Sequence, residues 1–192
     1  GTANPDFIAA DFLSQAEHGA DSQAMLVTSA ESIVSPVVDA IQQQLSELSR
    51  KDITAKALEH SRIIVLKDEQ EVIAFTNMYA PEHLIIQTEN YAHIAEQIEN
   101  AGSVFMGPYT PESAGDYASG TNHTLPTNGY AKAYSGVNLD SFIKKITFQE
   151  ITADGIRLLG GTIRTMAANE QLDAHKLSLI HISEPTRRVV IS

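Results

Sequence analysis

The chain has 192 residues, which is enough for one good hydrophobic core and a small appendage. Its apolar content of 43% argues against disorder, and its formal net charge of -11 argues against nucleic acid or an anionic membrane surface as a partner. The absence of cysteine excludes disulfides, thiolate zinc sites and cysteine nucleophiles and suits the cytoplasm, and no apolar run reaches the roughly 20 residues of a membrane helix.

Short apolar runs and amphipathic segments alternate along residues 1–106. Asn4 and Pro5 predict the start of the first helix, because asparagine favours the N-cap and proline favours the first helical position. Gly19 predicts the end of that helix. The predicted strands are residues 24–29, 62–66, 83–88 and 103–106, and the predicted helices are residues 5–19, 31–49, 53–60, 91–101 and a segment that starts at Asp68.

This alternation predicts parallel βαβ units with helices on both faces of a sheet, which is an α/β fold. Right-handed crossovers place the carboxyl ends of such strands along one edge, where open sheets bind ligands. Since residues 103–106 lead directly into residues 107–127, we expect the second of these segments to line a site.

The last part of the chain has a different pattern. Residues 142–148 are a candidate last strand, and residues 149–175 repeat apolar residues at helical spacing. The remaining segment lacks this periodicity, and Pro185 would break a helix. This segment could be the natural end of the protein or a foreign addition. We therefore expect an α/β domain, a helical arm and an atypical tail, at residues 1–148, 149–176 and 177–192.

The segment from Gly107 to Thr127, GPYTPESAGDYASGTNHTLPT, has little apolar content. Segments of this make-up are usually loops, which often display binding and catalytic groups. Asp116 and His123 are the residues in it best able to hold a metal or to handle a proton. The alternative is a surface loop with an Asx turn and a helix cap, which composition alone favours.

Gln15 and His18 lie three residues apart, so on a helix they share one face and could both point at one ion. Glutamine is an uncommon metal ligand, and this spacing alone favours a chance helix end. Glu170 and His175 lie five residues apart on the last helical segment and, by themselves, are typical of solvated helix positions.

Glu82 and His83 follow Ala80 and Pro81 at the start of a predicted strand. A carboxylic acid beside an imidazole supplies two acid–base groups, one of which titrates near neutral pH. Adjacent residues of a strand point to opposite faces, so both can serve one site only if the chain bends there. An exposed, charged strand start is the favoured alternative on this pattern alone.

A set of nitrogen and oxygen ligands without thiolate suits zinc. Spacing cannot show whether these residues converge. The glycines form neither the G-x-G-x-x-G pattern of dinucleotide-binding folds nor the G-x-x-x-x-G-K-[ST] pattern of phosphate-binding loops.

Five blocks of the sequence resemble the C-terminal half of histidinol dehydrogenase. They are FLSQAEHG at 12–19, APEHLIIQT at 80–88, GPYTPESAGDYASGTNHTLPT at 107–127, SGVNLDSFIKKITFQEIT at 135–152 and ANEQLDAHK at 168–176. The similarity extends over most of residues 1–176, and the string at 107–127 is long and specific. This family oxidises L-histidinol to L-histidine through L-histidinaldehyde in two NAD-dependent steps, which end histidine biosynthesis.

The resemblance implies roles for eight residues. It implies that Glu82 and His83 handle protons: His83 takes the alcohol proton while hydride leaves to NAD, and Glu82 activates water to attack the aldehyde. It implies that His123 and Glu170 bind substrate near the metal, together with His83 and the metal ligands. The zinc ligands that it implies, all of the residue type that the family requires, are Gln15, His18, Asp116 and His175.

The resemblance also implies a fold and an assembly. The fold is an incomplete Rossmann-like parallel sheet flanked by helices, with a C-terminal helical arm. In this family the last metal-ligand histidine comes from the arm of the other subunit, so we expect a homodimer with a shared active site. The tail after Lys176 leaves the family pattern.

The family's chain is more than twice as long as this one, and the start at Gly1 without methionine looks like the interior of a longer protein. We expect the cofactor-binding residues in the missing N-terminal half. We also expect this piece to be inactive alone and to expose apolar surface where the absent half would pack. Two other functions are open: a non-catalytic domain that binds zinc or an imidazole compound, and a zinc hydrolase that uses Glu82 or His83 to activate water.

Overall fold

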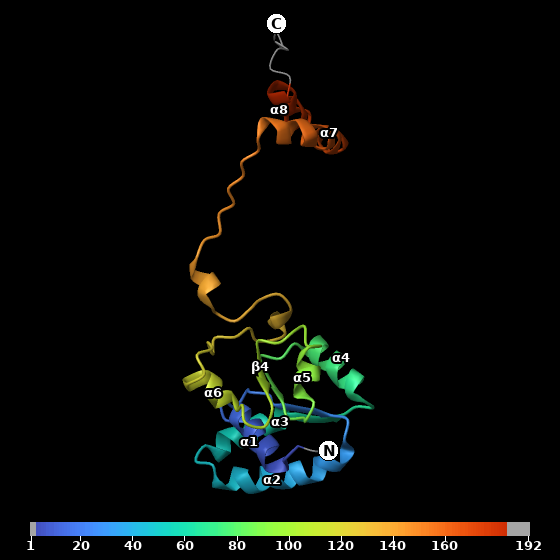
Figure 1. The fold of residues 1–192 in the computed structure, drawn as a ribbon. Helices are drawn as coiled ribbons and strands as arrows, with labels where there is room; N and C mark the ends of the chain where they lie inside the picture. The colour runs from blue at the N-terminus through green and yellow to red at the C-terminus, as the bar shows by residue number, and fades with distance from the viewer. Residues whose placement is uncertain (1–2, 184–192) are drawn as a thin grey trace. The chain divides into compact units, whose positions relative to one another are not determined.

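Two compact units make up the chain, residues 1–143 and residues 144–192. The structure, a computed structural model, describes residues 3–183 (Figure 1). The first unit contains the strands and most of the helices, and the second is helical.

Helices and short strands alternate in the first unit, which confirms the predicted α/β class. Each of the four predicted strands forms, although each is only four residues long. The elements of this unit are α1 (Pro5–Ala16), β1 (Met25–Thr28), η1 (Glu31–Ile33), α2 (Val34–Glu47), α3 (Lys51–His60), β2 (Arg62–Val65), α4 (Glu69–Tyr79), β3 (His83–Ile86), α5 (Tyr91–Ala95), β4 (Ser103–Met106), α6 (Glu112–Tyr117), η2 (Tyr130–Lys132) and η3 (Leu139–Phe142).

The four strands pair in two separate two-stranded sheets. Strand β1 pairs with β2 in parallel, with Met25 opposite Arg62. Strand β3 pairs with β4 in parallel, with His83 opposite Ser103. In the described part of the chain no hydrogen-bonded ladder joins β1 to β3.

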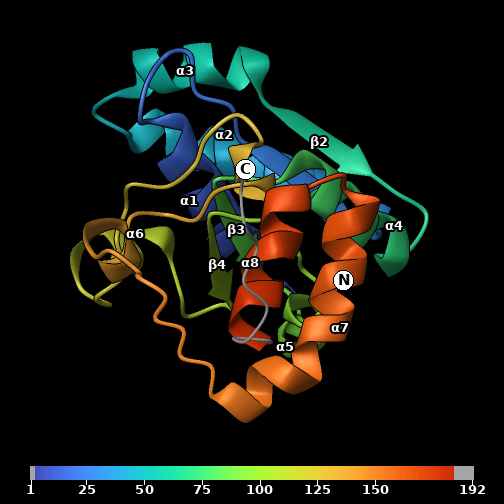
Figure 2. The same ribbon diagram turned by 90° about the horizontal axis from the view of Figure 1, so that it is seen from above.

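Two hydrophobic clusters accompany the two sheets. Helices α1, α2 and α3 lie together beside β1 and β2 (Figures 1 and 2). The cluster there includes Ile8, Phe12 and Val37, and Leu26 of β1 packs against it. The second cluster consists of Ile73, Ile86 and Ile94, from α4, β3 and α5. Burial of apolar side chains in these clusters supplies the main stabilisation of the unit.

Local signals fix the ends of the helices that frame the site. The Asn4 side chain accepts a hydrogen bond of 2.9 Å from Asp6 N–H at the start of α1, as the sequence predicts. The Asp68 side chain accepts one of 3.0 Å from Glu71 N–H at the start of α4. Ala80 ends α4 in a left-handed conformation with φ of 55°.

Two predicted elements differ in the structure. The expected strand at residues 142–148 is wrong, because residues 143–148 form no strand and Phe148 is 91% exposed. Alternating apolar residues form a strand only beside a second strand, and none of the described strands pairs with this segment. The expected helix over 91–101 ends at Ala95.

The second unit contains α7 (Ala153–Asn169) and α8 (Asp173–Ser183). The predicted helical segment 149–175 is therefore interrupted, and Gln171 adopts a left-handed conformation with φ of 61° between the two helices. Of the expected tail, residues 177–183 belong to α8, and residues 184–192 lie outside the described residues. None of the helices within residues 3–183 combines the length and apolar character needed to cross a membrane.

The close approach of β3 and β4 makes Gly102 sensitive to substitution. A Cβ at this position would lie 2.5 Å from the Glu82 carbonyl oxygen, which accepts a 2.9 Å hydrogen bond from Ser103 N–H. We expect Gly102→Ala to lower the free energy of unfolding of the first unit by about 1–3 kcal/mol. Urea unfolding followed by circular dichroism measures this.

Gly161→Ala is the matched control for Gly102→Ala. A Cβ there would meet no atom within 4 Å, and the position lies inside α7. Alanine favours the helix, so this variant should be neutral or more stable by about 0.5–1 kcal/mol. Equal unfolding curves for Gly102→Ala and the parent would contradict the close approach of the two strands.

Candidate functional site

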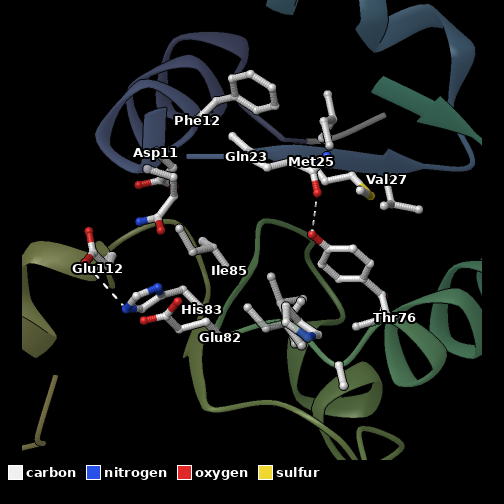
Figure 3. Close-up of a pocket in the computed structure, with 18 of the residues that line it drawn as sticks. Asp11, Phe12, Gln23, Met25, Val27, Thr76, Glu82, His83, Ile85 and Glu112 are labelled. Carbon is white, nitrogen blue, oxygen red and sulfur yellow. Dashed lines mark hydrogen bonds and ion pairs between the residues drawn. The ribbon is translucent and has the colours of Figure 1, made fainter. Parts of the chain in front are cut away.

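A cavity of about 1320 Å³ in the first unit collects most of the candidate site residues. It is lined by residues of α1, β1, α4, β3 and α6, among others (Figure 3). Six of the eight residues singled out in the sequence line it: Gln15, His18, Glu82, His83, Asp116 and His123.

Helix α1 brings Gln15 and His18 to the cavity. Gln15 lies in the last turn of α1, and His18 lies two residues beyond its end. Phe12 and Leu13 on the same helix are buried in the core, which fixes its orientation. The Gln15 Nε2 atom is buried and has no hydrogen-bond partner among the described residues. Rotation of this amide by 180° would present Oε1, the atom that binds cations, in the same place.

The end of α4 brings Glu82 and His83 to the same cavity. Ala80 leaves the helix in its left-handed conformation, and Pro81 cannot continue a helix. Strand β3 begins only at His83, so Glu82 lies before the strand, and the alternation of faces does not separate the two side chains. His83 is the first residue of β3, so this pair lies at the start of the strand, as the sequence predicts.

Helix α6 contributes two carboxylates from the segment predicted to be a loop. Glu112 begins this helix, and Asp116 lies four residues later on the same face. The Glu112 side chain is only 4% exposed. Its Oε1 lies 3.6 Å from His83 Nε2 and 3.8 Å from His18 Nε2 (Figure 3 shows the first contact). Both distances exceed a hydrogen bond, and Oε1 has no hydrogen-bond partner in the described part of the chain.

Glu112 is not among the eight residues singled out in the sequence. The available signal was the four-residue spacing of the two carboxylates in PESAGD, which puts both on one face if the segment is helical. Glycines and prolines around it favoured a loop, and a six-residue helix is too short to show periodicity.

The side chains around Glu112 offer ligands for a cation. His83, Glu112 and Asp116 each have one ligand atom, and these three atoms lie within 4.8 Å of one another. Imidazole nitrogen and carboxylate oxygen are ligands that zinc accepts. The set shares Asp116 with the ligands implied by the resemblance, and Gln15 and His18 line the same cavity. The unpartnered buried atoms of Gln15 and Glu112 fit a cation at this place.

Known proteins of similar sequence identify the family of this chain. The family model described as "Histidinol dehydrogenase" matches residues 1–181. The chain belongs to the histidinol dehydrogenase family. A histidinol dehydrogenase of Bacteroides thetaiotaomicron is 64% identical over 175 residues, which cover 91% of this chain and 41% of that protein. One from Aliivibrio fischeri is 55% identical, with 91% of this chain and 40% of that protein covered.

A solved structure supports the fold. The crystal structure of histidinol dehydrogenase from Elizabethkingia anophelis matches with a TM-score of 0.89 at 56% identity. The match covers 96% of this chain and 42% of that one. This chain therefore spans about two fifths of the length of the histidinol dehydrogenases that it matches.

Burial and mutual proximity shift the pKa values of three acid–base groups in this member of the histidinol dehydrogenase family. Burial raises the pKa of Glu82, and His18 acts in the opposite direction. Burial lowers the pKa of His83, which Asp116 partly offsets. Burial and then Asp116 raise the pKa of Glu112, against the effects of His18 and Gln15. These shifts favour a neutral His83 imidazole, which can accept a proton.

The remaining two candidates belong to the second unit. Glu170 is the C-cap of α7, and His175 lies in the first turn of α8. Both are exposed. Six of the eight candidates thus line one cavity of the first unit, and the other two lie on the helices of the second unit.

A part-buried polar contact in the lining of the cavity links α1 to the segment that follows β3. The Gln87 Nε2 atom donates a 2.6 Å hydrogen bond to Asp11 Oδ2. Gln87 Oε1 and Thr88 Oγ1 are buried without hydrogen-bond partners among the described residues. Burial raises the pKa of Asp11, and the hydrogen bond from Gln87 opposes the shift.

The raised pKa of Asp11 sets a pH dependence of stability. The folded state holds its proton to higher pH than the unfolded chain, whose ordinary value is 3.8. Stability is therefore lost as pH rises from 3.8 through the raised pKa. We expect Asp11→Asn to gain free energy of unfolding relative to the parent over this window and to show a constant difference below it.

Urea unfolding in the presence of a chelator, repeated at several pH values, measures this difference. Asp39→Asn, at an exposed position of α2, controls for the loss of one negative charge. A difference between Asp11→Asn and the parent that stays flat at every pH would show that Asp11 carries no such penalty.

Proposed function

We propose that this chain carries the metal-binding and proton-transferring part of a histidinol dehydrogenase, which oxidises L-histidinol to L-histidine through L-histidinaldehyde with NAD. The main support for this proposal is that, in a chain of this family, one cavity is lined by Gln15, His18, Glu82, His83 and Asp116. Those five side chains come from three separate parts of the sequence, so their common cavity is a property of the fold.

We assign zinc to Gln15, His18 and Asp116, with His175 as the fourth ligand. In a homodimer with a shared site, His175 would come from the second subunit. The support is chemical: the donors are two imidazoles, a carboxylate and an amide, and the Gln15 amide is buried with an unpartnered atom. When bound, Zn²⁺ would supply a redox-inert Lewis acid that fixes the amine and imidazole nitrogens of the substrate.

His83 is the proposed base for the alcohol step. Its ring is 12% exposed and lies at the cavity, with Glu112 on one side. The neutral imidazole takes the hydroxyl proton of histidinol as the C–O double bond forms, and the carbinol hydride leaves to the nicotinamide of NAD. The buried carboxylate of Glu112 stabilises the imidazolium that results.

Glu82 is the proposed base for the aldehyde step. Its carboxylate takes a proton from water as the oxygen attacks the aldehyde carbon, and the product is the aldehyde hydrate with one hydroxyl deprotonated. This anion then loses a second hydride to a second NAD, which gives the carboxylic acid, and the acid loses its proton to a base in the site, which gives the carboxylate of histidine. Two hydrides account for the four electrons of the overall oxidation.

The substrate and the assembly complete the proposal. His123 lines the cavity, and we assign it, with Glu170 of the helical arm, to the binding of substrate beside the metal. Together with NAD-binding residues from outside this chain, these groups form the site of a homodimeric, cytoplasmic enzyme.

Metal binding tests the ligand assignment without catalysis. We expect the chain to bind one Zn²⁺ or Co²⁺ per subunit, and Asp116→Ala to weaken binding by about a hundredfold. Equilibrium dialysis measures the affinity, and the visible absorption of Co²⁺ reports its coordination. His60→Ala is the control, since His60 lies at the end of α3 and outside the cavity lining. Equal losses in the two variants would exclude the assignment.

Turnover tests the reaction. The chain by itself should produce no NADH from histidinol, because it spans 41% of the length of the Bacteroides thetaiotaomicron relative. Mixed with the rest of that relative's polypeptide, it should regain turnover, and His83→Asn should lower kcat by about a hundredfold or more. NADH formation by the chain alone would contradict this.

The same assays separate the two other functions. Zinc binding that histidinol strengthens, with no turnover in the mixture, would favour a non-catalytic binding domain. Turnover without NAD would favour a hydrolase, because a dehydrogenase stalls when its hydride acceptor is absent.

A further inference from the structure

The sheet formed by β3 and β4 has two different faces. Successive side chains of a strand point to opposite faces, and Leu84 is paired with Val104 across the two strands. Leu84 and Val104 both pack against the second hydrophobic cluster, so one face of the sheet is turned to that cluster. The residues one position away, His83 in β3 and Phe105 in β4, therefore lie on the opposite face.

Phe105 is buried on the face of the sheet that carries His83. Only 5% of Phe105 is exposed. The centroid of its ring lies 6.0 Å from that of the His83 ring, and the two ring planes are tilted by 34°. Among the described residues, Phe105 belongs to neither hydrophobic cluster and does not line the cavity. Its burial therefore depends on other contacts.

Helix α6 supplies one of these contacts through Gly115. A Cβ at position 115 would lie 2.7 Å from Cε1 and 3.1 Å from Cζ of Phe105. Carbon atoms in favourable contact lie about 3.5–4.0 Å apart, so the ring occupies the space that a side chain at position 115 would need. Glycine is a poor helix former, and its place in a helix of only six residues is explained by this close approach.

The contact lies between the two carboxylates of α6. Gly115 follows Glu112 by three residues and precedes Asp116, and both acidic residues line the cavity. The buried Glu112 carboxylate lies 3.6 Å from His83 Nε2 (Figure 3). A helix of six residues is unstable by itself in water, so its position is fixed by tertiary contacts such as the one with Phe105.

We propose that Phe105 is a positioning residue of the site. Its ring is a spacer between α6 and His83, and it sets how far the two carboxylates of α6 lie from the proposed base. Gly115 is the matching part of α6, because any side chain there would push the helix and the ring apart. Neither residue is among the described residues that line the cavity, so both act through those that do.

The part of this inference that concerns the metal rests on the proposed function, because Asp116 is a proposed zinc ligand. The spacing between α6 and His83 does not rest on it, since the ring contacts are present without a metal. The two parts are therefore tested by separate measurements.

Nuclear Overhauser effects in the metal-free chain test the spacing. Cross-peaks should join the ring protons of Phe105 to the α-protons of Gly115 and to the ring protons of His83. Gly115→Ala should shift the His83 ring signals, because the Phe105 ring or the Glu112 carboxylate then moves by about 1 Å relative to His83. Missing cross-peaks in the parent, or unchanged His83 signals in folded Gly115→Ala, would overturn the inference.

Cobalt binding tests the consequence for the ligands. Gly115→Ala and Phe105→Leu should each weaken Co²⁺ binding by about tenfold and change its visible absorption, because Asp116 moves with α6. Leucine lacks the two ring atoms that a methyl group at position 115 would meet. The double variant should therefore lose about tenfold as well, and the hundredfold loss of two independent effects would contradict the contact.

Val37→Ala controls for a general loss of stability. Val37 is fully buried in the first hydrophobic cluster, and none of the residues of α2, all of which the structure describes, lines the cavity. This variant should keep the His83 signals, the Co²⁺ affinity and the Co²⁺ absorption of the parent. The same changes in Val37→Ala as in Gly115→Ala would show that destabilisation alone causes them, and would overturn the positioning role.

The two measurements separate this inference from the proposed function. A parent chain that binds no Co²⁺ would contradict the ligand assignment, while the cross-peaks of the metal-free chain would still decide the role of Phe105. Parent-like Co²⁺ binding and absorption in both single variants would overturn the positioning role and leave the ligand assignment intact. If Gly115→Ala does not fold, Phe105→Leu carries the cobalt test, because it adds no atom to the contact.

Discussion

The buried carboxylate of Glu112 is the contact on which the candidate site depends. It lies between the imidazoles of His18 and His83, at 3.8 and 3.6 Å, and so joins three elements that are distant in the sequence. Burial of this carboxyl group in its charged form is costly, and its pKa is raised first by burial and then by the nearby Asp116. A divalent cation bound beside Glu112 would interact with this carboxylate and offset the cost of its burial.

The orientation of α1 and β3 makes this contact possible. The end of α1 and the start of β3 line the same cavity, so Gln15 and His18 share it with His83, the first residue of the strand. The hydrogen bond between Asp11 and Gln87 joins the middle of the helix to the segment that follows the strand. The site therefore lies at the amino end of β3, with α6 placing its carboxylates against it. A site at the carboxyl ends of strands is the common arrangement in open sheets, and this chain departs from it.

The same cavity contains both polar and apolar groups. Its lining combines acid–base side chains near His83 with apolar side chains from both hydrophobic clusters. Four unpartnered side-chain atoms, in the part of the chain that the structure describes, belong to residues that line this cavity.

Sequence alone determined the class of the fold and the family. Short apolar runs marked all four strands, and Asn4, Pro5 and Asp68 marked helix starts, because these signals depend on residues near one another in the chain. The resemblance at residues 107–127 named the family that the comparisons confirm. The roles of Gln15, His18, Asp116 and His175 as ligands stay a prediction.

Tertiary structure decided what depends on contacts between distant segments. Residues 142–148 have a strand pattern but no neighbouring strand among the described ones, and so form none. Glu112 gained its place only through the contacts of its side chain with His83 of β3 and with His18, which follows α1, and no local pattern encodes these contacts. The division of the four described strands into two sheets likewise depends on distant segments, because the backbone groups of a strand form hydrogen bonds with other strands and not within the strand itself.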